Sequence, residues 1–153
     1  MGDDVHREIL LDCLGSARIS YCFHLWAYVI MPEHVHLLIW PREVVYDIAS
    51  ILRRIRQTSS RKILAYLRAA HSPLLTSLRL RNGYRVWQHG SGYDRNVFTP
   101  EVIHASIDYI HENPVRRGLV ESSLDWPWSS ARWYHGRRDC VLRVDTCPVF
   151  RQR

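Results

Sequence analysis

The stretch Tyr28-Val-Ile-Met-Pro-Glu-His-Val-His-Leu-Leu-Ile-Trp40 places two histidines two residues apart in an otherwise apolar segment. Side chains on a strand alternate between its two faces, so His34 and His36 are expected to share a face, about 6.7 Å apart along the backbone. Two imidazoles on one face can chelate a single metal ion. The alternative is a pair of half-buried polar residues with ordinary hydrogen bonds. Glu33 is interpreted as a turn residue and left out of the candidate site.

The apolar pattern around this stretch predicts an α+β fold. Helical stripes and strand-like runs alternate along the chain in the order helix–strand–strand–helix–strand–helix. The predicted elements are a helix from Asp3 to about Ser20, a strand from His24 to Met31, a Met31-Pro32-Glu33 turn, a histidine strand ending near Pro41, a helix from Val44 to about Ala70, a strand around Tyr84 to Gln88 and a last helix opened by Thr99. This order matches a split βαβ, ferredoxin-like antiparallel sheet with helices.

The last predicted helix carries a second candidate group. Thr99 can cap its start, and it should end near Asn113 because Pro114 supplies no N–H. Tyr109 and Asn113 lie at positions i and i+4 and project from one face, whereas His111 lies about 200° around the helix and is left out of the site. The alternatives are that Tyr109 is an aromatic residue at the edge of the core and that Asn113 only terminates the helix.

Four motifs in this chain resemble those of the single-tyrosine transposases of the HUH superfamily. They are His34-Val35-His36 after Tyr-Val-Ile-Met-Pro, Trp87-Gln88-His89-Gly90 with Tyr93-Asp94-Arg95, Tyr109-Ile-His-Glu-Asn-Pro-Val-Arg-Arg-Gly-Leu-Val120, and Asp125-Trp-Pro-Trp-Ser-Ser-Ala131. Their order and spacing are similar to those of insertion-sequence-200-like transposases, in the REP-associated tyrosine branch that acts on single-stranded DNA hairpins. The resemblance runs from about Val5 to Tyr134.

The resemblance implies metal-dependent cleavage and joining of single-stranded DNA through a 5′-phosphotyrosine intermediate, as in DNA transposition. In this chain it implies Tyr109 as the nucleophile, His34 and His36 as metal ligands and Asn113 as the third ligand, with Mg²⁺ or Mn²⁺ as the ion. The chemistry is sensible, because phosphoryl transfer depends mainly on positioning and charge stabilisation, which a metal ion supplies as a Lewis acid. Two imidazoles and an amide oxygen suit manganese, while magnesium prefers more oxygen ligands.

One departure from the family concerns the start of the sheet. The related proteins begin with a central strand, and nothing before Asp3 can supply one, so the expected sheet lacks it. An exposed strand edge would favour pairing between two copies, as a homodimer. The first alternative function is therefore a truncated or domesticated protein that binds DNA hairpins without catalysis. The second is a ferredoxin-like RNA-binding domain, although histidines stand where an aromatic ribonucleoprotein motif would be expected.

The net charge of +6 is unevenly distributed along the chain. No acidic residue occurs from Ile48 to Tyr93, and 20 of the 21 basic residues are arginines, whose planar groups suit bidentate phosphate contacts. For any single arginine, the alternative is a solvated helix face. The predicted DNA-binding residues are Arg53, Arg54, Arg56, Arg61, Lys62, Arg68, Arg81 and Arg85, with Arg116 and Arg117 after the tyrosine.

Length and composition predict one domain. The 153 residues are 46% hydrophobic, which argues against disorder, and the interpretation is a transposase-like domain over 1–153 with motifs in about 5–134 and a basic tail over 135–153. No apolar run approaches the roughly 20 residues that span a bilayer, and no signal-peptide pattern is present. We expect a soluble, cytoplasmic, DNA-associated protein without a membrane partner.

Overall fold

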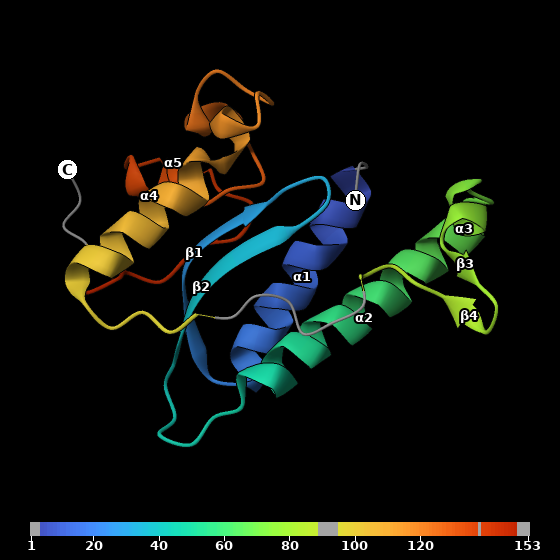
Figure 1. The fold of residues 1–153 in the computed structure, drawn as a ribbon, viewed down its shortest axis with the longest axis horizontal. Coiled ribbons are helices and arrows are strands. Elements are labelled where there is room, and N and C mark those ends of the chain that lie inside the picture. The colour runs from blue at the N-terminus through green and yellow to red at the C-terminus, as the bar shows by residue number, and fades with distance from the viewer. Residues whose placement is uncertain (1–3, 89–94, 138, 150–153) are drawn as a thin grey trace.

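A two-stranded antiparallel hairpin lies between helices in the computed structural model, which describes residues 4–88, 95–137 and 139–149 (Figure 1). Helix α1 packs on β1 and on α2, while α4 packs against both strands. The helices are α1 (Asp4–Ser20), α2 (Ile48–Ala69), α3 (Leu74–Ser77), α4 (Pro100–Arg116) and α5 (Ala131–Tyr134), with a 3₁₀ turn at Ser123–Asp125. The strands are β1 (Phe23–Ile30), β2 (Val35–Pro41), β3 (Arg79–Leu80) and β4 (Gly83–Tyr84). The α+β prediction is confirmed.

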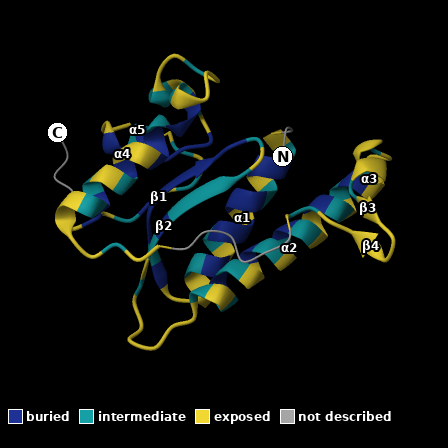
Figure 2. Cartoon of the chain, viewed as in Figure 1, coloured by how far each residue is buried: buried dark blue, intermediate teal, exposed yellow. Residues whose placement is uncertain are grey.

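Strand β1 forms the centre of the core. All of its residues except His24 are buried, and the strand is dark along its length in Figure 2. Its run of consecutive apolar residues is typical of a strand buried on both faces. The predicted hairpin is confirmed, because Ile30 pairs with Val35 and Phe23 with Pro41 across the predicted turn. The core therefore positions the histidine segment.

The edge of β1 that does not pair with β2 is hydrogen-bonded to the C-terminal part of the chain. The backbone bonds are Ile30 N–H to the Trp128 carbonyl (2.9 Å), Ser130 N–H to the Tyr28 carbonyl (3.0 Å) and Asp145 N–H to the Leu25 carbonyl (2.8 Å). Two side chains add to them, because Tyr134 Oη donates to the Trp26 carbonyl and the Trp126 indole to the Ile30 carbonyl. This edge is therefore not open for pairing with a second copy. The homodimer stays a prediction, but an exposed edge of β1 no longer supports it.

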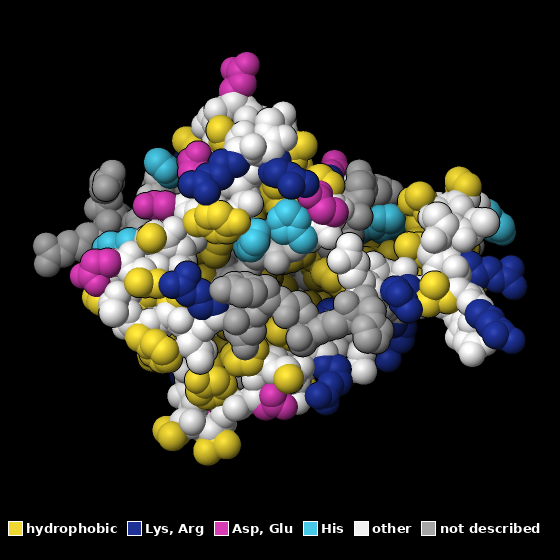
Figure 3. All heavy atoms as spheres, in the orientation of Figure 1, with side chains coloured by type: hydrophobic (Ala, Val, Ile, Leu, Met, Phe, Trp, Pro, Cys, Tyr) yellow, Lys and Arg dark blue, Asp and Glu magenta, His cyan; other side chains and the backbone are white. Residues whose placement is uncertain are grey.

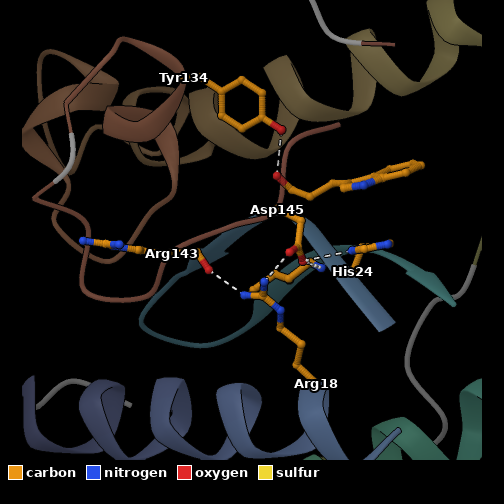
Figure 4. Close-up of polar contacts among 7 residues, drawn as sticks. Arg18, His24, Tyr134, Arg143 and Asp145 are labelled. Carbon is orange, nitrogen blue, oxygen red and sulfur yellow. Dashed lines mark hydrogen bonds and ion pairs between the residues drawn. The ribbon is translucent and has the colours of Figure 1, made fainter. Parts of the chain in front are cut away.

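Asp145 fixes the C-terminal segment to β1 (Figure 4). Its carboxylate accepts from the Leu25 N–H at 2.8 Å, pairs with Arg18 of α1 and lies 3.5 Å from His24 Nδ1. Arg18 also donates to the Arg143 carbonyl at 2.7 Å. One carboxylate thus joins α1, β1 and the tail.

We expect Asp145→Ala to lower the free energy of unfolding by about 1–3 kcal/mol, because Arg18 and the Leu25 N–H would lose their shared acceptor. The measurement is urea unfolding at neutral pH. The matched control is Asp139→Ala, since Asp139 pairs with Arg132 and Arg137 at the exposed surface, where ion pairs contribute little to stability. Equal losses in the two variants would contradict the role given to Asp145.

Helix α2 begins later than predicted. The sequence predicted a helix from Val44, but the first helical residue is Ile48, and Val44 and Val45 are 97% and 90% exposed. The reason is the cap at Asp47, whose carboxylate accepts from the Ala49 N–H at 2.9 Å. The apolar pair before the cap therefore stands in a loop.

The strand predicted around Tyr84 to Gln88 is wrong. Only Gly83–Tyr84 is extended, and it pairs with Arg79–Leu80 in a small hairpin at the far end of α2 (Figure 1). The Trp87 indole instead donates to Ser59 Oγ of α2 at 3.0 Å, so this segment packs on the helix. Within the described residues the main sheet consequently has two strands.

Helix α4 continues beyond the predicted end at Asn113. It includes Pro114 and ends at Arg116, because a proline in the last turn removes only one hydrogen bond. The end is closed by Arg117 N–H to the Asn113 carbonyl and by Gly118, whose φ of +64° suits glycine.

The described part of the predicted basic tail packs onto the core. Val144 and Cys147 are 4% and 2% exposed and belong to the same apolar cluster as β1. Across the described ranges, no helix combines the length and apolar character needed to cross a bilayer.

Candidate functional site

The two histidines lie where the hairpin turns. His36 is in β2, paired with Val29, whereas His34 precedes the strand by one residue. The prediction that both lie within the strand is therefore wrong for His34, because the Met31 N–H bonds to the His34 carbonyl and closes the turn there. The two imidazoles still lie together in an edge-to-face arrangement, with ring centroids 4.8 Å apart at 83°.

Tyr109 stands beside this pair on α4. Its ring centroid is 5.5 Å from that of His36, at an interplanar angle of 80°. The tyrosine is 45% exposed, and the Arg116 guanidinium lies 5.1 Å from its ring centroid. Residues 73 positions apart in the sequence therefore meet at an accessible surface. A phenol, two imidazoles and a guanidinium share one small region.

Burial lowers the pKa of His36 below its usual value of 6.5, and repulsion from His34 lowers it further. The charged imidazolium is disfavoured because the ring is partly withdrawn from water. His36 is accordingly neutral at pH 7, which leaves a ring nitrogen lone pair free to bind a cation.

Glu33 belongs to this region, although the sequence indicated only a turn residue there. Its carboxylate pairs with Arg117 at the end of α4 and lies 3.5 Å from His34 Nδ1. The pair ties the hairpin turn to the helix that carries Tyr109. A signal was available in the sequence, because an acidic residue adjoins the first histidine and two arginines follow Pro114.

Asn113 lies in the last part of α4, with 6% of its surface exposed. Its Nδ2 donates to the Tyr109 carbonyl at 2.8 Å, so the oxygen Oδ1 is the atom left for a cation. Among the described residues, no group of three or more His, Cys, Asp and Glu side chains could hold a metal ion. A metal site here would consequently consist of the histidine pair completed by an amide, a phenol or substrate oxygens.

Histidine side chains gather on the face formed by the hairpin and α4, with Arg and Lys side chains beside them (Figure 3). Arg116 and Arg117 are both part of this region, one against the Tyr109 ring and the other paired with Glu33. Both arginines, which the sequence predicted to bind DNA, therefore also contact side chains of the candidate site.

The remaining predicted DNA-binding residues lie on α2 and the β3–β4 hairpin. Lys62 pairs with Asp12 of α1, and Arg68 stacks over Tyr84 at 5.2 Å, so these two also have structural contacts. Arg56 is half-buried. The others are exposed: Arg53, Arg54, Arg61, Arg81 and Arg85.

His111 lies outside the site, as its position around the helix predicted. It is 7% exposed, its Nε2 is 2.9 Å from Ser130 Oγ, and its ring is 5.1 Å from that of Tyr134. Its surroundings belong to the packing of α4 against the C-terminal segment.

Comparisons with known proteins identify the family of this chain. Residues 2–112 match the family described as "Transposase IS200 like". The chain belongs to the IS200-like transposase family. A protein of Haemophilus influenzae named as a REP-associated tyrosine transposase is 28% identical over 137 residues, which cover 83% of this chain and 73% of that protein.

The REP-associated tyrosine transposase of Escherichia coli is 31% identical to this IS200-like chain over 125 residues, covering 80% of the chain and 63% of that protein. The fold is similar to a solved structure of a REP-associated tyrosine transposase bound to a REP hairpin. Its TM-score is 0.57 at 23% identity, over 94% of this chain and 76% of the other. The match supports the fold of the chain.

Proposed function

We propose that this IS200-like transposase cleaves and rejoins single-stranded or hairpin DNA through Tyr109, with a divalent ion held by His34 and His36. The observation that carries the proposal is the approach of Tyr109 to His36, 5.5 Å between ring centroids, at an exposed surface. The partner is inferred from the family and from the exposed arginines near the site. Metal dependence is inferred from the two adjacent imidazoles of His34 and His36.

The donor set fits a divalent ion such as Mn²⁺ or Mg²⁺. His36 is neutral at pH 7, His34 faces it, and Asn113 Oδ1 is the proposed third ligand. Such an ion supplies Lewis-acid polarisation of the phosphate and stabilises charge in the transition state. Mixed nitrogen and oxygen donors suit Mn²⁺ better than Mg²⁺.

In the proposed reaction the Tyr109 oxygen attacks the phosphorus of a DNA phosphodiester. A tyrosine–phosphate bond forms as the bond to the 3′ oxygen breaks, the phenol loses its proton and the 3′ oxygen gains one. Arg116, beside the Tyr109 ring, is placed to favour the phenolate and the phosphate charge. The ester conserves the phosphodiester energy, so attack by another 3′-hydroxyl rejoins the strand.

The test incubates the protein with end-labelled DNA hairpins carrying unpaired extensions, in Mn²⁺, Mg²⁺ or EDTA. We expect a slow-migrating, protease-sensitive covalent adduct in metal and none in EDTA. Tight hairpin binding without an adduct in either metal would favour the non-catalytic binding protein. Preference for RNA over DNA would favour the RNA-binding alternative.

His34→Ala and His36→Ala are each expected to weaken Mn²⁺ binding at least tenfold, because one imidazole alone cannot chelate. Titration calorimetry of the free protein measures this without any DNA. The matched control is His135→Ala, since His135 is exposed and lies outside the site. Unchanged titrations in both site variants would exclude the proposed chelate.

A further inference from the structure

Two neighbouring cavities with aromatic walls lie at the opposite end of the β1–β2 hairpin from the histidines. The Trp26 and Trp40 rings stack there, with centroids 5.1 Å apart at 17°, and Trp40 is 46% exposed. The cavities, of about 260 and 440 Å³, are both lined by these tryptophans and by Phe98, which is 80% exposed. Their sizes approach and enter the range of small-molecule sites.

Trp26, which lines both cavities, carries a buried hydrogen-bond donor without an acceptor among the described residues. The residue is 4% exposed, and within the described ranges its indole N–H has no acceptor. By contrast, the indoles of Trp87 and Trp126 donate to Ser59 Oγ and to the Ile30 carbonyl. Buried donors are normally satisfied, so an unsatisfied donor on a residue that lines both cavities is a candidate partner for an acceptor on a bound ligand.

The second cavity, of about 440 Å³, lies on the face that carries the candidate site, because Trp40 and residues of α4 line it. Trp40 follows His36 by four residues on β2, so the two side chains point to one face about 13 Å apart. Helix α4 spans the same interval, with Tyr109 beside His36 and Ile103 in the cavity wall. Exposed hydrophobic side chains are visible on this face near the first turn of α4 (Figure 3).

We infer that the space lined by Trp26, Trp40 and Phe98 binds one unpaired nucleobase of the DNA strand. This inference rests on the proposed function. The base stacks on the exposed Trp40 and Phe98 rings, and an oxygen or ring nitrogen on its edge accepts from the Trp26 indole. Arg95, which lines the first cavity, supplies positive charge for the adjoining phosphate. At about 3.4 Å per nucleotide, 13 Å places this base within about four nucleotides of the scissile phosphate.

The experiment measures equilibrium binding in EDTA, so that no cleavage occurs. Hairpins carry an unpaired extension in which one nucleotide at a time is made abasic. For the wild-type protein we expect one position, within about four nucleotides of the cleavage point, at which loss of the base weakens binding about 5- to 100-fold. A flat profile along the extension would overturn the inference.

Three variants assign the effect to the cavity. Trp40→Ala and Phe98→Ala should each weaken binding of the intact hairpin. They should also reduce the loss of affinity that an abasic nucleotide causes at the sensitive position. Trp26→Phe, which keeps an aromatic ring but removes the indole N–H, should have the same two effects. Phe98→Ala guards against misfolding, because that side chain is largely exposed. Tyr21→Ala, at an exposed position after α1, should leave the profile unchanged.

A penalty that is identical in the wild type and all three cavity variants would overturn the inference, because the base would then bind elsewhere. Failure of the proposed function would look different. In that case hairpins would bind with the same base-sensitive position but would form no adduct in metal.

Discussion

Tyr109→Phe is expected to abolish the covalent protein–DNA adduct while leaving hairpin affinity within about twofold of the wild type. The change removes one oxygen, the proposed nucleophile, and keeps the ring that contacts His36 and Arg116. No other group would take its place, because the reaction needs a nucleophile in line with the scissile bond. Denaturing gels of labelled hairpins in Mn²⁺ measure the adduct, and filter binding in EDTA measures affinity.

The matched control for this experiment is Tyr21→Phe, which removes the hydroxyl group from an exposed tyrosine outside the site. It should retain the full adduct yield. An adduct that persists in Tyr109→Phe would show that another residue attacks the phosphate. Peptide mapping of the labelled adduct would then identify that residue, and the site proposed around the hairpin would be rejected.

The hairpin and the long helices could be predicted from the sequence because their signals are local. Alternating and continuous apolar runs define β1 and β2, and Pro32 marks the turn between them. The approach of Tyr109 to His36 is different in kind, since no periodicity joins residues 73 positions apart. It was expected only from the resemblance to a family, and the structure places the two rings together.

Non-local contacts account for what the sequence did not predict. Glu33 looked like a turn residue, but Arg117 from the end of α4 lies beside it. Trp87 looked like part of a strand because aromatic residues are common in sheets, but its indole bonds to Ser59 on α2. Asp145 carried no motif, and its role follows only from the edge of β1 that β2 leaves unpaired, where its carboxylate accepts from the Leu25 N–H. In each case the partner is supplied by another element of the fold.

The stability of the protein is expected to fall steeply between pH 6.5 and pH 4 because of His111. Burial, with a smaller contribution from His135, lowers the pKa of His111 from 6.5 to about 4. In that window the unfolded chain binds a proton that the folded chain does not, so the free energy of unfolding decreases as the pH falls. The stabilisation is fully present above pH 6.5, and the loss by pH 4 amounts to about 3 kcal/mol.

Comparison of the wild type with His111→Phe isolates this effect, because other titrating groups are common to both proteins. Phenylalanine keeps a ring against Tyr134, and Ser130 Oγ retains its bonds with the backbone of Tyr28. Urea unfolding from pH 7 to pH 4 should give a shallower pH dependence for the variant, by up to about 1.4 kcal/mol per pH unit. His135→Asn, at an exposed position, should keep nearly the wild-type slope. Parallel profiles for the wild type and His111→Phe would mean that His111 is protonated within the fold, and the packing of α4 against the C-terminal segment would then have to tolerate a charged imidazole.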